Sequence, residues 1–99
     1  MADKIRVSFS GLVRNALGIQ EEELPVADGM RVRDLIDELW HRHGNAFAYS
    51  VLNRNGSLRA NAQVFLDNRD VADMAGLDTK LEDYAEAFIS VVVYPEEGG

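Results

Sequence analysis

The sequence predicts an α+β fold in which a mixed sheet carries one main helix on one face. Apolar and polar residues alternate near both ends of the chain, at 5–10 and 87–94, with the period of a half-buried strand. One long amphipathic stretch, at 32–43, separates these two regions. The chain has 99 residues, of which 46% are hydrophobic and 27% charged, and this suffices for a single domain with one modest core.

Two strands are expected in the first part of the chain, at 5–10 and 21–26, on either side of a short apolar turn at 12–17. The first strand directs three apolar side chains to the core: Ile5, Val7 and Phe9. The second would form a hairpin with it, and Pro25 restricts that strand to a sheet edge, because proline donates no hydrogen bond to a ladder. We interpret the glutamates at 21–23 as a solvated edge rather than as a metal site.

The strongest periodic signal lies at 32–43, where apolar residues recur three and four positions apart, as on one face of a helix. These residues are Val32, Leu35, Ile36, Leu39, Trp40 and His43. We expect Trp40 in the core and His43 at the end of the apolar face. Gly44 is suited to end the helix, whereas Arg31 stands where Ser, Thr or Asp would cap it better. The two histidines are two positions apart and do not face each other, so no metal site is expected.

The second half of the chain is predicted to add two helical turns and three strands. In order, they are a helical turn at 46–52, a strand at 64–66, a tight turn at 67–70 into a brief strand at Val71, a helical turn at 79–81 and a last strand at 87–94. Asp67 and Asp70 flank the tight turn, where Asp side chains commonly accept backbone hydrogen bonds. We assign them this role rather than acid–base chemistry.

Sequential hairpins at both ends, with one helix between them, predict a mixed sheet of four to five strands with the helix packed on one face. The first and last strands would lie side by side in the centre. This arrangement is the β-grasp, or ubiquitin-like, fold. We assign residues 1–94 to this domain and 95–99 to a flexible carboxyl-terminal tail.

Composition excludes several functions. The formal net charge of −7 argues against nucleic acid or an anionic membrane as a partner, since their binding surfaces need clustered Lys and Arg, and it fits a basic protein. The absence of cysteine excludes disulfides, Cys-ligated zinc and thiol nucleophiles. Neither a signal peptide nor a membrane span is recognisable. We expect a cytoplasmic protein that works with a partner and is not an enzyme itself.

The tail ends in Gly98-Gly99, a candidate reactive end. Because glycine lets another backbone approach closely, such an end can enter a narrow slot in a partner; a frayed terminus is the alternative. Pro95 cannot continue a central strand and would separate the sheet from the tail. Glu96 and Glu97 would keep the tail solvated and be attracted by a basic channel.

A partner-binding surface is expected on the sheet face away from the helix. Strand alternation points Val64, Leu66, Ile89, Val91 and Val93 inward. It points four others outward: Phe65, Phe88, Val92 and Tyr94. We expect Phe65, Val92 and Tyr94 to form an exposed apolar patch with Phe88 at one side, as at an interface hot spot. The alternatives are that one or two of them are singly exposed side chains, or that the strand register is shifted by one residue.

Three segments carry a resemblance to a known family. Residues 29–36 (GMRVRDLI) are similar to its Gly-x-Thr-Val-x-Asp-Leu helix opening, with Arg31 in place of Thr. Residues 63–71 (QVFLDNRDV) are similar to its strand–turn–strand stretch, and 83–99 to its Asp-Gly-Asp-x-Val, strand, Pro and Gly-Gly ending, with Tyr84 in place of Gly. The chain thus resembles the MoaD/ThiS-type sulfur carriers, which include the small subunit of molybdopterin synthase, the thiamine and cysteine sulfur carriers and the archaeal ubiquitin-like modifiers.

The resemblance implies a carrier protein. A carboxylate is ionised at neutral pH and is a poor electrophile; an E1-like partner would therefore adenylate Gly99 with ATP. A sulfur donor would then convert it to a thiocarboxylate for an acceptor enzyme such as the large subunit of molybdopterin synthase, the pathway we favour. The chain itself would bind no cofactor. Two alternatives stay open: a ubiquitin-like modifier that forms isopeptide conjugates through Gly99, and an interaction module in which the two glycines are incidental.

Overall fold

The computed structural model describes residues 4–81 and 84–92 of the chain. Its elements are β1 (Lys4–Gly11), α1 (Leu12–Leu17), β2 (Glu21–Pro25), α2 (Val32–His43), α3 (Asn45–Val51), β3 (Ala62–Leu66), β4 (Arg69–Asp70), the 3-10 helices η1 (Val71–Asp73) and η2 (Gly76–Asp78), and β5 (Glu86–Val91). None of the helices in these ranges is long and apolar enough to cross a membrane.

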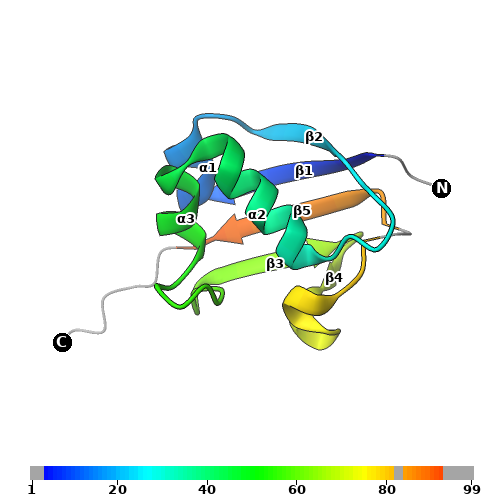
Figure 1. Cartoon of the computed structure of the whole chain (residues 1–99). Helices are drawn as coiled ribbons and strands as arrows, with labels where there is room; N and C mark the ends of the chain where they lie inside the picture. Colours follow the sequence, from blue (N-terminus) through cyan, green and yellow to red (C-terminus); the bar gives the residue numbers. More distant parts are fainter. Residues whose placement is uncertain (1–3, 82–83, 93–99) are drawn as a thin grey trace.

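The five strands form one mixed sheet in the order β2-β1-β5-β3-β4, and α2 lies across one face of it (Figure 1). β1 pairs with β5 in parallel and with β2 in antiparallel orientation, and β3 is antiparallel to both β4 and β5. The first and last strands are therefore neighbours in the centre, and β2, with Pro25, is an edge. The predicted β-grasp fold is confirmed.

The core lies between the sheet and the helices. All residues of the strands that were predicted to point inward, within the described ranges, are buried, as are four from the apolar face of α2. They are Ile5, Val7, Phe9, Val64, Leu66, Ile89 and Val91 from the sheet, and Val32, Leu35, Ile36 and Leu39 from the helix. Burying such side chains removes apolar surface from water, which is the main favourable contribution to folding. Val93 lies outside the described residues.

The prediction that Trp40 lies in the core is wrong, because 42% of this residue is exposed. Phe47 and Val51 of α3 are both fully buried and supply the core at this end of the molecule. The helical period places Trp40 at the margin of the apolar stripe, where it lies at the surface beside α3. The sequence predicted only a short turn for α3 and so underestimated its contribution.

The short elements that follow β3 also differ from the prediction. The brief strand is Arg69–Asp70, and Val71 begins the 3-10 helix η1. The helical turn expected at 79–81 lies earlier, at Gly76–Asp78. In both places the turns are too short to leave a periodic signal in the sequence.

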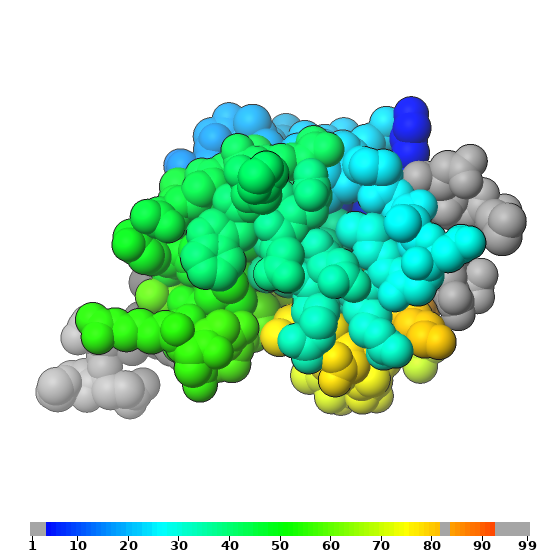
Figure 2. Space-filling model, viewed as in Figure 1, coloured from blue at the N-terminus to red at the C-terminus, as the bar shows by residue number. Residues whose placement is uncertain are grey.

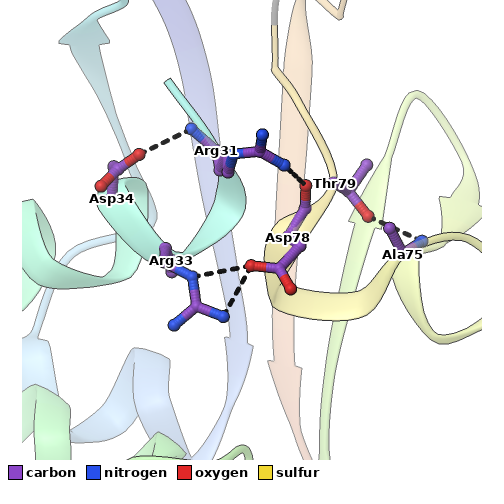
Figure 3. A network of polar contacts seen from close by, with 6 residues as sticks. All are labelled: Arg31, Arg33, Asp34, Ala75, Asp78 and Thr79. Carbon is purple, nitrogen blue, oxygen red and sulfur yellow. Dashed lines mark hydrogen bonds and ion pairs between the residues drawn. The ribbon is translucent and has the colours of Figure 1, made fainter. Parts of the chain in front are cut away.

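The start of α2 explains why an arginine is tolerated at the capping position. The backbone N–H of Arg31 donates to Asp34 Oδ2 (2.9 Å), and the Arg31 guanidinium donates to the carbonyl oxygen of Asp78 (2.7 Å). Arg33 donates to Asp78 Oδ1 through Nε (2.9 Å) and Nη2 (2.7 Å) (Figure 3). The Arg31 side chain thus does not cap the helix, as Ser, Thr or Asp would; it joins the start of the helix to η2 instead.

The other end of α2 is joined to the edge strand β2. Glu22 is half-buried, contacts the His43 ring nitrogen Nε2, and accepts a hydrogen bond from Arg42 Nη1 (3.3 Å). The His43 ring also lies edge-on to Phe9, with the ring centroids 6.4 Å apart. The solvated edge predicted at 21–23 therefore holds for Glu21 and Glu23, whereas Glu22 ties the edge strand to the helix.

The hairpin between β3 and β4 has the predicted turn chemistry. Asp67 and Asn68 both have positive φ angles, 46° and 75°, as the two central residues of a tight hairpin require. Asp67 Oδ1 accepts the N–H of Glu86 (2.9 Å), and Asp70 Oδ1 accepts the N–H of Ala72 (2.9 Å). The structural role assigned to both aspartates is confirmed.

Gly11 ends β1 where the two central strands are in closest contact. Its φ is +74°, and a Cβ added there would lie 2.0 Å from the carbonyl oxygen of Val91. Only glycine fits this position, because both the backbone angle and the space exclude a side chain.

We predict that Gly11→Ala lowers the free energy of unfolding by more than about 2 kcal/mol, since strain at positive φ adds to displacement of the Val91 backbone. Gly18→Ala is the matched control: Gly18 has φ +72° but nothing within 4 Å of its added Cβ. It should cost about 1 kcal/mol. Urea denaturation measures both, and equal losses in the two variants would contradict the close contact.

Candidate functional site

The strand that leads to the carboxyl terminus lies in the middle of the sheet. β5 is hydrogen-bonded on both sides, and Val91 pairs with Gly11 of β1 and with Ala62 of β3. A strand held by two ladders has both its position and its direction fixed at its last residue. The molecule therefore presents the end of this strand as a rigid exit point (Figure 1).

Asn61 extends this support by one residue. The N–H of Val92 donates to the Asn61 carbonyl oxygen (3.1 Å), and Asn61 Nδ2 donates to the Val92 carbonyl oxygen (2.7 Å). Sequence reasoning missed Asn61, because an asparagine in a polar loop carries no signal that distinguishes it from its neighbours. The segment that follows Val92 holds six of the predicted site residues, which lie outside the described residues: Tyr94, Pro95, Glu96, Glu97, Gly98 and Gly99.

The outer face of the sheet, away from α2, carries two of the aromatic residues that were predicted to point outward. Phe65 and Phe88 are directly opposite each other in the β3–β5 register, with ring centroids 6.0 Å apart and ring planes 40° apart. Phe88 is 40% exposed and Phe65 is half-buried. We call these two residues the aromatic pair.

Val92 is exposed (44%) but does not join the aromatic pair. Ser90 lies between Phe88 and Val92 on the same face, and its partners across the two ladders are Ser10 and Gln63. Val92 is four residues beyond Phe88, or about 13 Å along the strand. The predicted patch grouped Phe65 with Val92, whereas the register places Phe65 beside Phe88 and a polar row separates these two from Val92. Tyr94, the third member of that patch, lies outside the described residues.

A hollow of about 280 Å³ adjoins the aromatic pair. Its lining residues are Ser8, Phe65, Asp67, Asn68, Glu86, Ala87 and Phe88. Glu86 is exposed and lies 3.8 Å from Arg6 Nη1, as an open surface ion pair. Aromatic rings next to two carboxylates suit a partner that presents an apolar side chain beside a basic one.

Comparison with solved structures finds the same fold in proteins of the kind that the sequence resembles. The small archaeal modifier SAMP1 from Haloferax volcanii superposes with a TM-score of 0.75 at 19% identity, over 97% of this chain and 99% of that one. A putative molybdopterin converting factor subunit 1 from Pyrococcus furiosus gives 0.67 and 24%, over 93% and 100%. The Amycolatopsis orientalis BexX/CysO complex gives 0.70 and 24%, over 92% and 98%.

Comparison of the sequence with protein-family models and with curated proteins gives no match. At the identities above, the structural likeness shows the β-grasp fold, which this chain shares with these proteins.

A double-mutant cycle tests the geometry of the outer face. Phe65→Ala and Phe88→Ala should show a coupling of about 0.5–1.5 kcal/mol in unfolding free energy, because the two rings contact each other. The matched cycle of Phe88→Ala with Val92→Ala should show coupling below about 0.5 kcal/mol, because these side chains are separated. Coupling in the second cycle and not in the first would contradict the register.

Proposed function

We propose that the protein is a sulfur carrier: an E1-like enzyme adenylates Gly99, a sulfur donor converts it to a thiocarboxylate, and the sulfur serves cofactor biosynthesis, with the molybdopterin type favoured. The observation that carries this proposal is the central position of β5, whose end is held by Gly11 and Asn61 immediately before the segment that leads to Gly98-Gly99. Such a strand gives a partner a fixed starting point for that segment.

The fold and its relatives support a carrier. Proteins of closely similar structure bear the names of a small archaeal modifier, a molybdopterin converting factor subunit and a CysO protein in complex with BexX. Each of these names describes a small protein that works with others. The seven residues 93–99 that follow the described part of β5 can span at most about 25 Å, enough to enter a partner's active site.

The chemistry assigns the catalysis to partners. One oxygen of the Gly99 carboxylate would attack the α-phosphorus of ATP, and pyrophosphate would leave. The terminal sulfur of a donor persulfide would then attack the acyl carbon, and AMP would leave with the carboxylate oxygen. A thiol of the donor enzyme would cleave the S–S bond of the resulting acyl disulfide, which leaves the thiocarboxylate on Gly99 and a disulfide on the donor enzyme. The sequence contains no cysteine, so the sulfur must come from another protein.

The aromatic pair would contribute the docking surface. It lies on the face opposite α2, so a partner can cover it without displacing the helix. Its neighbouring carboxylates, Asp67 and Glu86, would favour a basic partner, as does the net charge of −7.

Intact-mass measurement of protein purified from its native host tests the chemistry. We expect a chain ending at Gly99, part of which has gained the mass difference between sulfur and oxygen and reacts with iodoacetamide. Because the chain has no cysteine, alkylation reports the thiocarboxylate and no other thiol. Absence of this species after co-expression with every cognate activating enzyme would contradict the proposal.

The second candidate is a ubiquitin-like modifier, and the likeness to SAMP1, a small archaeal modifier, is the observation that favours it. A tagged chain would then form a ladder of lysine conjugates in the host, and the ladder would vanish when Gly98-Gly99 is deleted. If this deletion left the cellular function intact, the protein would instead be an interaction module.

Truncation of the aromatic pair tests the docking surface. We predict that Phe88→Ala raises the KM of the activating enzyme for this chain about tenfold, as loss of an aromatic hot spot does. Leu12→Ala is the control, because Leu12 is similarly exposed (38%) but lies on α1. Equal effects of the two substitutions on KM would show that the partner does not use the outer sheet face.

A further inference from the structure

A second aromatic surface lies on the helical layer, far from the aromatic pair. Trp40 of α2 and Tyr49 of α3 are 42% and 69% exposed, and they border a hollow of about 560 Å³. Figure 2 views the molecule from this side, with α2, α3 and the loop after α3 toward the reader. Ala48 and Leu52, both buried, contribute the apolar part of the lining.

The same hollow carries two positively charged side chains. Arg54 and Arg59 line it, both are exposed, and neither forms an ion pair with any described residue. By contrast, two arginines of α2 are paired, Arg33 with Asp78 and Arg42 with Glu22 and Glu38. Among the described residues, no carboxylate lines the hollow.

The loop that holds these arginines is fixed to α3. The N–H of Arg59 donates to the Val51 carbonyl oxygen (2.9 Å), and the N–H of Asn53 donates to the Ser57 carbonyl oxygen (2.8 Å). Asn53 Nδ2 also donates to the Leu58 carbonyl oxygen (3.2 Å), and Leu52 bridges to Leu58. The arginines are therefore carried by an internally hydrogen-bonded loop, which lowers the entropy lost when they bind a ligand.

We propose that this hollow docks an acidic peptide segment of a partner protein, with one apolar side chain placed against Ala48 and Leu52. Guanidinium groups bind carboxylates through paired hydrogen bonds, and the exposed rings add apolar contact area. The net charge of −7 disfavours an acidic segment elsewhere on the surface, and two neighbouring arginines beside an apolar hollow offset that repulsion locally. Nucleic acid is disfavoured by the same net charge. The proposal does not depend on the chemistry of Gly99.

Trp40 gives a direct probe, because it is the only tryptophan of the chain. We would titrate the full-length protein with a capped, Trp-free peptide of glutamates interrupted by one leucine, and follow Trp40 emission together with the backbone amide shifts of Arg54 and Arg59. We expect saturable changes in both, and a rise in Kd as NaCl is added. The same peptide with lysine in place of glutamate should not bind.

Two charge-reversal variants separate the effect of charge in the hollow from the effect of the net charge of the protein. The double substitution Arg54→Glu and Arg59→Glu should raise Kd about tenfold or more. The matched double substitution Arg14→Glu and Arg69→Glu, which changes net charge equally at exposed positions on α1 and β4, should raise it less than about threefold. Circular dichroism verifies folding of both variants.

Four results would overturn the proposal: no response of Trp40 to the glutamate peptide, equal losses in the two double variants, equal binding of the lysine peptide, or displacement of the glutamate peptide by single-stranded RNA. Because the assay uses no ATP and no activating enzyme, its failure would leave the sulfur-carrier proposal untouched, and failure of the mass measurement would leave this one untouched.

Discussion

The parallel pairing of β1 with β5 is the interaction on which the rest of the structure depends. It joins residues from opposite ends of the chain, and both hairpins are attached to it, β2 through β1 and β3 through β5. Gly11 permits this pairing to continue to its end, because any side chain there would meet the Val91 carbonyl oxygen. The central pair of strands thereby determines where the carboxyl-terminal segment leaves the sheet. α2 covers one face of the sheet, and the other face stays open to a partner.

This architecture gives the protein two chemically different surfaces on opposite layers. The outer sheet face combines the aromatic pair with the carboxylates of Asp67 and Glu86. The helical layer combines Trp40 and Tyr49 with Arg54 and Arg59, which form no ion pair within the described part of the chain. A carrier must be recognised by the enzyme that loads it and by the enzyme that unloads it. Surfaces of opposite charge on the two layers would allow one partner with a basic surface and another with an acidic surface to bind the same chain.

Much of this fold could be predicted from the periodicity of apolar residues, because strands and one helix that bury one face leave a clear pattern. The pattern placed Ile5, Leu35 and Ile89 in the core, and the Asp67–Asn68 turn was evident from its composition. The prediction for Trp40 was wrong because residues of the short helix α3 fill the core at that end of the molecule. Asn61 and the basic hollow were missed because they depend on contacts between segments distant in sequence, which no local pattern records.

The most direct test of the central claim is to trap the activated carboxyl terminus. The full-length chain is incubated with its activating enzyme and ATP labelled at the α-phosphate, without a sulfur donor, and the product is analysed for AMP attached to Gly99. We predict stoichiometric acyl-adenylate on the native chain and none on a chain whose terminal carboxylate is amidated. Labelling of both chains, or of neither with any cognate enzyme, would contradict the role of Gly99.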